Sequence, residues 1–396
     1  MSSAPSPIGV LIVDDSPFMR LALQKILGLD SRLKVLGIAR DGKEGIAKLR
    51  ALHPQVVTMD VEMPVMDGLR ALDEIMRWQP TPVIILSALT TEGAHATLKA
   101  LDLGAVDVVA KPAGSPGTDL AAMSRDLIEK IRAAAEVDPS RLGVSPGKGC
   151  SSGAAANGVK ASETDRHKVS AREFPGGKAF SSPLAEPHAR GFVAGVISAA
   201  RPQYPVEVVA IGTSTGGPAA LQTVLPQLPQ DFPVPVVVAQ HMPPGFTGPL
   251  AQRLNGLCSL EVREGKDGEA LRAGIICVAP AGKQTQVVRK AGRLCLAIGE
   301  ESPIPTLYHP SVDVLFLSLA REVGGGTLGV VMTGMGRDGA EGMKQIKALG
   351  GFAIAEAEES CVVYGMPKAL VEGGLADRVV PLGEIGRTIT ECVMGG

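Results

Sequence analysis

The sequence predicts an α/β protein with two parallel sheets: an N-terminal doubly wound sheet of five strands, and a larger C-terminal sheet with an added antiparallel hairpin. Short runs rich in Val and Ile, typical of strands buried on both faces, recur along residues 1–135 and again from residue 206 to the end. Segments with helical spacing separate these runs. Strands that alternate with helices form parallel sheets, which predicts this fold class.

The N-terminal part, residues 1–135, contains five candidate strands. The first, IGVLIV, is followed by the helical segment SPFMRLALQKILGL, and the second is followed by GKEGIAKLRAL. One helix after each strand indicates a doubly wound sheet. The predicted strands are residues 8–13, 33–39, 54–59, 82–86 and 105–110.

Residues 136–205 lack this pattern and are dominated by Ser, Gly, Ala, Pro and charged residues. This composition predicts a flexible linker. A flexible chain of this length spans roughly 45 Å, so the linker alone does not determine how its neighbours dock. The apolar segment GFVAGVISAA, residues 191–200, is compatible with a short helix.

Residues 206–396 form the predicted second domain. Two further apolar segments, TQVVRK and RLCLAI within residues 285–298, are separated by a turn that contains glycine, which predicts an antiparallel hairpin. The predicted strands of the parallel sheet are residues 206–211, 234–240, 274–279, 328–333 and 351–357.

Composition and charge exclude several classes of function. The 39 basic and 41 acidic side chains nearly cancel, so we expect no nucleic-acid partner and no general attraction to anionic lipid. Six scattered cysteines without a CxxC pair are typical of reduced thiols in a cytoplasmic protein. We expect no secretory signal and no membrane insertion, because the N-terminus lacks a basic region and the longest uncharged stretch, 208–230, is interrupted by Gly, Pro and Gln.

Polar side chains follow four of the N-terminal strands. Asp14 and Asp15 follow the first strand and Asp60 the third, whereas Ser87 follows the fourth and Lys111 the fifth. The carboxyl ends of parallel strands lie at one edge of the sheet, where ligands bind, so we expect these five side chains to converge.

Three neighbouring carboxylates repel one another unless a cation lies among them, and oxygen ligands suit Mg²⁺. One carboxylate can then attack a phosphoryl group, while a hydroxyl and a lysine contact the transferred oxygens. Each residue alone is also compatible with a helix cap or a surface charge. The five together favour a phosphoryl site.

This set, with the stretch VTMDVEMPVMDG at residues 57–68, resembles the response-regulator receiver domain over roughly residues 8–133. Many receivers carry an aromatic switch residue three positions before the lysine, where this chain has Val108, so we expect no aromatic rotamer switch there. The resemblance implies a phospho-acceptor at Asp60, Mg²⁺ ligands at Asp14, Asp15 and Asp60, a switch hydroxyl at Ser87 and a phosphate partner at Lys111.

In the C-terminal domain, too, polar residues follow the predicted strands, but they are of other types. Ser214 lies in the turn GTSTGGPAAL after the first strand, His241 follows the second strand, and Asp338 follows the strand LGVVMT in the loop GMGRDG. All three should lie on one rim of the sheet. A hydroxyl, an imidazole and a carboxylate are the parts of a nucleophile–base–orienter triad.

The glycines around Ser214 favour this interpretation. Gly212, Gly216 and Gly217 permit a tight turn in which backbone N–H groups approach a developing oxyanion. The helix that starts near Pro218 adds its positive end, and the loop TGMG (333–336) offers further N–H groups.

The turn and each of the three triad residues also have other interpretations. Phosphate or dinucleotide binding is less favoured, because the turn lacks the GxGxxG spacing and the Lys–Ser/Thr of a P-loop. The order Ser, His, Asp excludes an ordinary α/β-hydrolase. Singly, Ser214 and Asp338 are compatible with helix caps, and His309, beside Tyr308, competes with His241 as the base.

GTSTGGPAALQTVL, VVAQHMPPGFT and MTGMGRDGAEGM together resemble the catalytic domain of the chemotaxis protein-glutamate methylesterases, the CheB family, over about residues 206–392. The order receiver, linker, esterase is also similar. The resemblance implies Ser214 as nucleophile, His241 as general base and Asp338 as the residue that orients the imidazole, with Thr215 next to the nucleophile and Met335 in the oxyanion loop.

The resemblance further implies a cytoplasmic hydrolase that demethylates glutamate γ-methyl esters, and deamidates glutamines, on chemoreceptors. It implies a histidine kinase as phosphodonor, Mg²⁺ in the receiver and no cofactor for the ester chemistry. Unphosphorylated, the receiver would cover the rim that holds Ser214. Two alternatives stay open: a receiver-gated hydrolase of another ester or amide, and a catalytically silent binding module.

Overall fold

The computed structural model describes residues 6–88, 90–112, 118–142 and 200–395. The predicted linker, residues 136–205, is described only at its two ends. The short helix considered for residues 191–200 lies, except for residue 200, outside the described residues.

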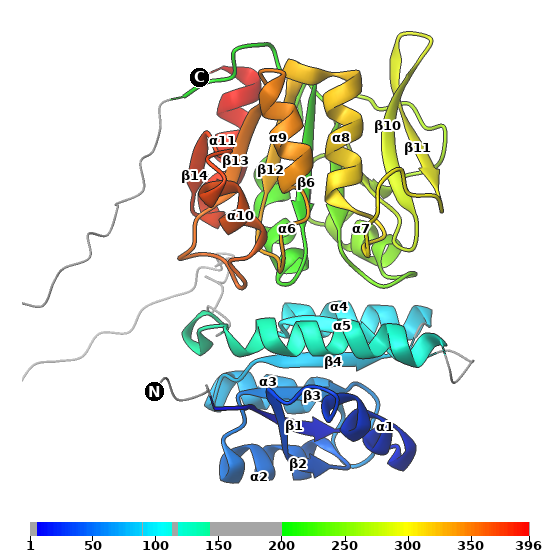
Figure 1. Cartoon of the computed structure of the whole chain (residues 1–396), viewed down its shortest axis with the longest axis vertical. Coiled ribbons are helices and arrows are strands. Elements are labelled where there is room, and N and C mark those ends of the chain that lie inside the picture. Colours follow the sequence, from blue (N-terminus) through cyan, green and yellow to red (C-terminus); the bar gives the residue numbers. More distant parts are fainter. Residues whose placement is uncertain (1–5, 89, 113–117, 143–199, 396) are drawn as a thin grey trace, which may run out of the picture. The chain divides into compact units, whose positions relative to one another are not determined.

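The N-terminal sheet has five parallel strands in the order β2-β1-β3-β4-β5, which confirms the doubly wound fold (Figure 1). Helix α1 packs against α5, whereas α2 packs against α3 and α3 against α4. The strands are β1 (Ile8–Val13), β2 (Leu33–Ala39), β3 (Val56–Asp60), β4 (Val83–Ser87) and β5 (Asp107–Ala110). The helices are α1 (Pro17–Leu27), α2 (Gly42–Leu52), α3 (Gly68–Trp78), α4 (Thr91–Asp102) and α5 (Thr118–Ala135), followed by the 3₁₀ turn Pro139–Arg141.

Local sequence accounts for these boundaries. Helix α1 begins where Ser16 accepts a hydrogen bond from the backbone N–H of Met19 and Pro17 occupies the first turn. In α3 the buried positions Ala71, Leu72, Ile75 and Met76 repeat at helical spacing and form one apolar stripe. Strands β1, β3 and β4 are almost entirely buried, whereas β2 is largely half-buried, and the polar residues Asp60 and Ser87 are the last residues of β3 and β4.

The C-terminal sheet has seven parallel strands in the order β14-β13-β12-β6-β7-β9-β8. The nucleophile candidate follows its central strand, β6. The strands are β6 (Val208–Thr213), β7 (Val236–Gln240), β8 (Glu261–Glu264), β9 (Ile275–Val278), β12 (Thr327–Val331), β13 (Phe352–Glu356) and β14 (Arg378–Val380). The helices are α6 (Gly217–Val224), α7 (Thr247–Asn255), α8 (Val312–Glu322), α9 (Ala340–Ala348), α10 (Met366–Glu372) and α11 (Leu382–Met394), with 3₁₀ turns at Leu225–Gln227 and Gly324–Gly326.

The predicted hairpin is present as β10 (Gln284–Lys290) and β11 (Arg293–Gly299), which pair antiparallel in a separate two-stranded sheet. Figure 1 shows this hairpin beside α8, and β10 packs against that helix. The hairpin matters for the site because Gln284, its first residue, is fully buried.

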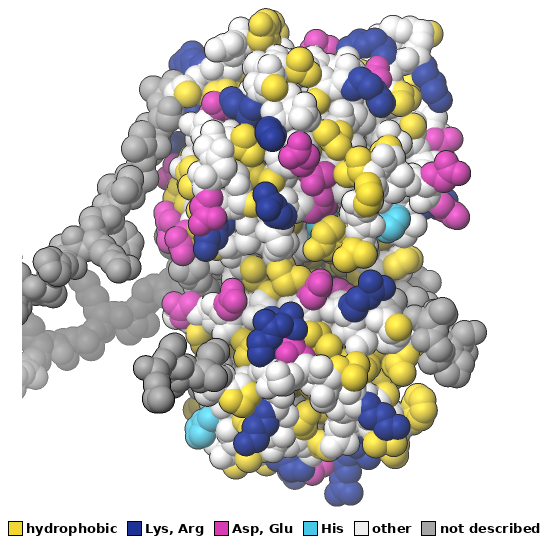
Figure 2. All heavy atoms as spheres, in the orientation of Figure 1, with side chains coloured by type: hydrophobic (Ala, Val, Ile, Leu, Met, Phe, Trp, Pro, Cys, Tyr) yellow, Lys and Arg dark blue, Asp and Glu magenta, His cyan; other side chains and the backbone are white. Residues whose placement is uncertain are grey.

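Two surface properties bear on function. On the face drawn in Figure 2, acidic and basic side chains are interspersed over both α/β parts, in keeping with the balanced charge of the chain. Among the described helices, none combines the length and the apolar character that a membrane crossing requires.

Candidate functional site

The N-terminal site is a cluster of carboxylates at the carboxyl edge of the first sheet. Oxygen atoms of Asp14, Asp15 and Asp60 all lie within 4.8 Å of one another. Lys111 Nζ lies 3.0 Å from Asp14 Oδ2 and 2.6 Å from Asp60 Oδ2. Burial raises the pKa of Asp60, the nearby Asp14 and Asp15 charges add to this, and the Lys111 ion pair opposes it. The three oxygens form a hard donor set of the kind that Mg²⁺ prefers, so the residues fit this ion.

Ser87 lies at the same edge, but among the described residues no hydrogen bond joins its hydroxyl to the carboxylates. It is the last residue of β4, one position beyond the residue that pairs with Asp60. Its hydroxyl donates to the carbonyl of Gly93, at 3.2 Å. The structure thus brings Asp14, Asp15, Asp60 and Lys111 together and places Ser87 beside them with its hydroxyl engaged elsewhere.

Ser214 lies in a backbone turn between β6 and α6. Its N–H donates to the carbonyl of Thr333, at 3.0 Å, and its own carbonyl accepts from Gly217 N–H, at 2.8 Å. Gly216 adopts φ 79° and caps α6 without any side-chain hydrogen bond, so the Ser214 hydroxyl is not a helix cap. A Cβ atom at Gly217 would lie 2.1 Å from Gln240 Oε1, so any other residue there would displace the buried Gln240 side chain.

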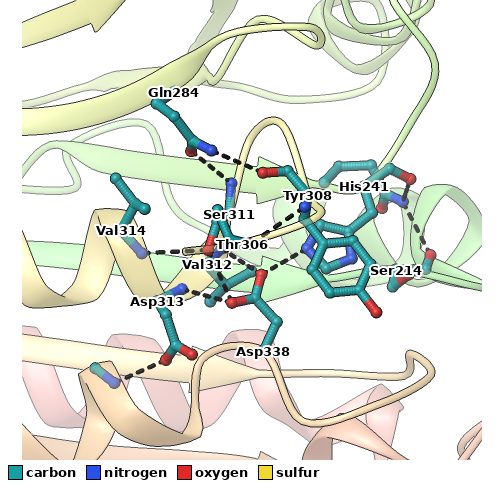
Figure 3. A network of polar contacts seen from close by, with 12 residues as sticks. Ser214, His241, Gln284, Thr306, Tyr308, Ser311, Val312, Asp313, Val314 and Asp338 are labelled. Atoms are coloured by element: carbon teal, nitrogen blue, oxygen red, sulfur yellow. Dashed lines mark hydrogen bonds and ion pairs between the residues drawn. The ribbon is translucent and has the colours of Figure 1, made fainter. Parts of the chain in front are cut away.

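His241 follows β7 and reaches Asp338 across the rim of the sheet. Its Nε2 atom lies 2.8 Å from Asp338 Oδ2, and the carboxylate accepts this hydrogen bond. Its Nδ1 atom is buried and has no hydrogen-bond partner among the described residues. Figure 3 shows the imidazole between Asp338 on one side and Ser214 on the other. With Nε2 protonated toward Asp338, Nδ1 carries the lone pair that can accept a proton.

Asp338 is held by four donors and is almost completely buried. Besides His241, it accepts hydrogen bonds from the Ser311 hydroxyl (2.9 Å) and from the backbone N–H groups of Val312 (2.7 Å) and Asp313 (3.0 Å), at the start of α8. Burial would raise the pKa of Asp338, but the hydrogen bonds and charge of His241, with the α8 backbone donors, outweigh burial and lower it.

The alternative interpretation of Asp338, a cap for the helix that follows it, is wrong. That helix, α9, is capped by Gly339 without a side-chain hydrogen bond. Asp338 instead accepts from the first turn of α8, a helix that precedes it in the chain. The imidazole that contacts Asp338 belongs to His241, whereas the competing candidate His309 contributes its carbonyl to Gly282 N–H.

The loop of residues 333–336 lies against Ser214. A Cβ atom built at Gly334 would be 2.8 Å from the Cβ of Ser214, so only a glycine backbone can approach the serine this closely. Thr333 joins the loop to the turn: its hydroxyl donates to the carbonyl of Thr215, at 2.9 Å. Met335 follows and is partly buried. The loop and the turn that holds Ser214 are therefore packed directly against each other.

Sequence reasoning missed Glu356, the last residue of β13, which is fully buried. Glu356 Oε2 accepts a hydrogen bond from Thr333 N–H, at 2.7 Å, and Oε1 accepts one from the Ser360 hydroxyl, at 3.0 Å. Thr333 in turn forms hydrogen bonds with Ser214 and Thr215, so Glu356 helps to hold the backbone around the nucleophile in place. A glutamate that ends an otherwise apolar strand was the available signal.

The fold and the site define a class: a receiver-type α/β part and a serine-hydrolase-type α/β part in one chain. Residues 10–121 match the model of the response regulator receiver domain, and residues 209–389 match the model of CheB methylesterase.

Similar proteins cover the chain almost completely. A protein-glutamate methylesterase/protein-glutamine glutaminase of Desulfitobacterium hafniense (strain Y51) is 63% identical over 399 residues, which cover 99% of each chain. One from Moorella thermoacetica is 44% identical over 421 residues and covers 98% of this chain and 99% of its own. The crystal structure of the Thermotoga maritima CheB methylesterase catalytic domain is 40% identical, with a TM-score of 0.46, and covers 48% of this chain and 99% of its own. The chain belongs to the CheB family of protein-glutamate methylesterases/protein-glutamine glutaminases with a receiver domain.

Proposed function

We propose that this protein hydrolyses glutamate γ-methyl esters on chemoreceptors, and deamidates selected glutamines to glutamate, under the control of phosphorylation. One observation carries the proposal: Asp338 holds His241 by Nε2, which leaves a buried Nδ1 on the side of the imidazole where Ser214 lies. A hydroxyl, a base and a fully hydrogen-bonded carboxylate in this order support nucleophilic acyl transfer.

In the first half-reaction the Ser214 hydroxyl oxygen attacks the ester carbonyl carbon, and its proton passes to Nδ1 of His241. Asp338 accepts the hydrogen bond from Nε2–H and stabilises the imidazolium that forms. The backbone N–H groups of Thr215, next to Ser214, and of Met335, in the loop 333–336, would receive the oxyanion, helped by the positive end of α6. The imidazolium then protonates the leaving methoxide, and methanol departs.

In the second half-reaction a water molecule attacks the acyl-serine. Nδ1 of His241 takes a proton from this water, and as the intermediate collapses the imidazolium gives that proton to the departing Ser214 oxygen. The products are the free glutamate carboxyl group and the starting enzyme. With a glutamine side chain, the leaving group is ammonia instead of methanol, and the remaining steps are the same.

The N-terminal site supports control by phosphoryl transfer. We assign Asp60 as the phospho-acceptor, with Lys111 as the cation that contacts the transferred oxygens and Ser87 as the switch hydroxyl. Mg²⁺, held by Asp14, Asp15 and Asp60, would offset the negative charge that develops on the phosphoryl group. The phosphoryl group would come from the chemotaxis histidine kinase, and both partners imply a cytoplasmic protein.

We assign the domains as a receiver at residues 1–135, a flexible linker at 136–205 and a methylesterase at 206–396. In the unphosphorylated chain the receiver inhibits the esterase, and phosphorylation of Asp60 relieves the inhibition. A fragment of residues 206–396 should therefore be more active than the unphosphorylated full chain.

The experiment that tests the proposal is methanol release from methylated chemoreceptor by the purified full chain. It is run with and without Mg²⁺ and a small phosphodonor, beside Ser214→Ala. Release that rises with the phosphodonor and disappears in Ser214→Ala supports both the chemistry and its control. Hydrolysis of generic small esters without release from receptor would contradict the assigned substrate. No reaction with either, from folded protein, would favour a binding module.

A further inference from the structure

Tyr308 lies flat against the imidazole of His241. The two ring centroids are 4.1 Å apart and the ring planes differ by 3°, which is a parallel stack (Figure 3). Among the described residues, no hydrogen bond joins the Tyr308 side chain to Ser214 or Asp338. Its position on the face of the imidazole indicates an effect on the orientation of the base.

One buried side chain, Gln284, holds the backbone of Tyr308 and of the residues that follow it. Gln284 Nε2 donates to the carbonyl of Tyr308, at 2.7 Å, and Gln284 Oε1 accepts from Ser311 N–H, at 3.0 Å. Gln284 is only 1% exposed, so water does not compete for these hydrogen bonds. The backbone N–H of Tyr308 also donates to the Thr306 hydroxyl, at 3.2 Å. The aromatic ring is therefore carried on a fixed backbone.

The same segment anchors the carboxylate that His241 contacts. The Ser311 hydroxyl and the N–H of Val312 donate to Asp338, three and four residues after Tyr308. Residues 306–313 thus hold both the partner of Nε2 and the surface on which the imidazole lies. A displacement of this segment would move the plane and the hydrogen-bond partner of the ring together.

The stack supplies a constraint that the hydrogen bond to Asp338 does not. One hydrogen bond at Nε2 positions that atom but leaves the ring free to tilt about it. A flat aromatic surface against the ring restricts the tilt and so determines where Nδ1 points. The electron-rich face of Tyr308 also interacts favourably with the imidazolium that forms during acyl transfer.

We propose that Tyr308 is a positioning residue for the acyl-transfer chemistry: by stacking on His241 it keeps Nδ1 directed at Ser214 while Asp338 holds Nε2. This inference rests on the proposed function for the roles of Ser214 and His241. It adds that a planar side chain at position 308, held by Gln284, determines the rate of nucleophile activation.

The test measures the rate at which a fluorophosphonate probe labels Ser214, in the full chain treated with Mg²⁺ and phosphodonor. The probe reports nucleophile activation without a receptor, so a wrong receptor assignment does not affect it. Tyr308→Phe keeps the planar ring and removes the hydroxyl, whereas Tyr308→Leu removes the ring. Ser214→Ala gives the background, and thermal unfolding of each variant reports folding.

We expect Tyr308→Phe to label within about threefold of the wild-type rate and Tyr308→Leu to label on the order of 10²-fold more slowly, the effect of a misplaced catalytic group. With methylated receptor as substrate, the same loss should appear in kcat, with KM changed by less than about threefold, because no contact with substrate is removed. Tyr308→His, another planar ring, should restore labelling to within about tenfold of wild type.

Wild-type labelling by folded Tyr308→Leu would overturn the proposal. Equal losses in Tyr308→Phe and Tyr308→Leu would also overturn it, since they would assign the effect to the hydroxyl, which lies near Gly336. If Tyr308→Leu does not fold, Tyr308→Met replaces it, because methionine has a similar length but no planar face. If the probe labels all ring variants as expected while receptor releases no methanol, the inference stands and the substrate assignment fails.

Discussion

The carboxyl edges of the two parallel sheets hold aspartates in opposite electrostatic settings. At the N-terminal edge, Asp60 is surrounded by Asp14, Asp15 and one cation, and its pKa is raised. At the C-terminal edge, Asp338 accepts four hydrogen bonds and its pKa is lowered. A carboxylate whose lone pairs are all engaged is a poor nucleophile but a good orienter. A crowded one with few donors can bind a cation and accept a phosphoryl group.

In both domains the topology of the parallel sheet determines where the site lies, whereas the hydrogen-bond donors and charges around each aspartate determine its chemistry. Both edges lie where a parallel sheet delivers its loops. At the N-terminal edge the ammonium group of Lys111 contacts Asp60, whereas at the C-terminal edge the first turn of α8 donates two backbone hydrogen bonds to Asp338. Substitution of single residues at either edge tests these assignments one at a time.

The largest effect should come from Ser214→Ala, which removes the nucleophile. We expect hydrolysis of methylated receptor to fall by roughly 10⁶-fold, to the level of a site that only binds and polarises its substrate. Methanol release measures it, with Ser318→Ala as a control for folding, because Ser318 is another buried serine of the same domain and its hydroxyl donates within α8, to the carbonyl of Leu315. A residual rate above about 1% of wild type would contradict the assignment of Ser214.

Asp338→Asn should lower kcat by about 10⁴-fold, because an amide in place of the carboxylate does not stabilise the imidazolium and favours the wrong ring tautomer. Ser311→Ala removes only one of the four donors to Asp338, so a much smaller loss, about tenfold, is expected. Steady-state kinetics on one receptor preparation compares the two. Equal losses would show that Asp338 acts only as a structural anchor for α8.

Asp60→Asn should abolish the activation by phosphodonor while the basal rate stays within about twofold, because Asp60 lies outside the esterase chemistry. Removal of Mg²⁺ with a chelator should have the same effect on wild type, since Asp14 and Asp15 then repel the incoming phosphoryl group. Asp73→Asn, which removes a carboxylate from an exposed ion pair with Arg77, is the matched control. Activation of Asp60→Asn by the phosphodonor would refute the coupling.

The smallest effect concerns stability of the N-terminal part at low pH. Arg132 donates to Asp30 and lowers the pKa of Asp30 from its ordinary 3.8 to about 2. The folded-state pKa is depressed, so this contribution is present above about pH 4 and is lost as pH falls toward 2. Screening by solvent reduces it to about 1 kcal/mol.

Hydrogen exchange of peptides from α1 and α5, at pH 7 and pH 3, measures this contribution in wild type and Asp30→Asn. We expect faster exchange in the variant at pH 7 and a smaller difference at pH 3. Asp73→Asn again serves as the control, because its ion pair with Arg77 is exposed. A difference between wild type and Asp30→Asn that grows toward low pH would contradict the sign.

Strands that are largely apolar runs were predictable, including β2, in which Lys34 is exposed and residues 35–38 are only partly buried. β1 and β2 have the predicted bounds, residues 8–13 and 33–39. The bounds of the other predicted strands differ from the observed ones by only a few residues. The two missed strands, β8 and β14, are short edge strands with charged residues, EVRE and RVV. Their pairing depends on the neighbouring strand rather than on their own composition.

The sequence by itself determined the two α/β parts and the residues that end their strands, because burial patterns and strand order are local properties of the chain. Only the tertiary structure decided which groups support the predicted residues: the first turn of α8 that donates to Asp338, Tyr308 on the imidazole and Glu356 beside Thr333. These contacts join residues from separate elements, such as His241 and Tyr308. No spacing in the sequence encodes them, because they depend on how the folded elements pack.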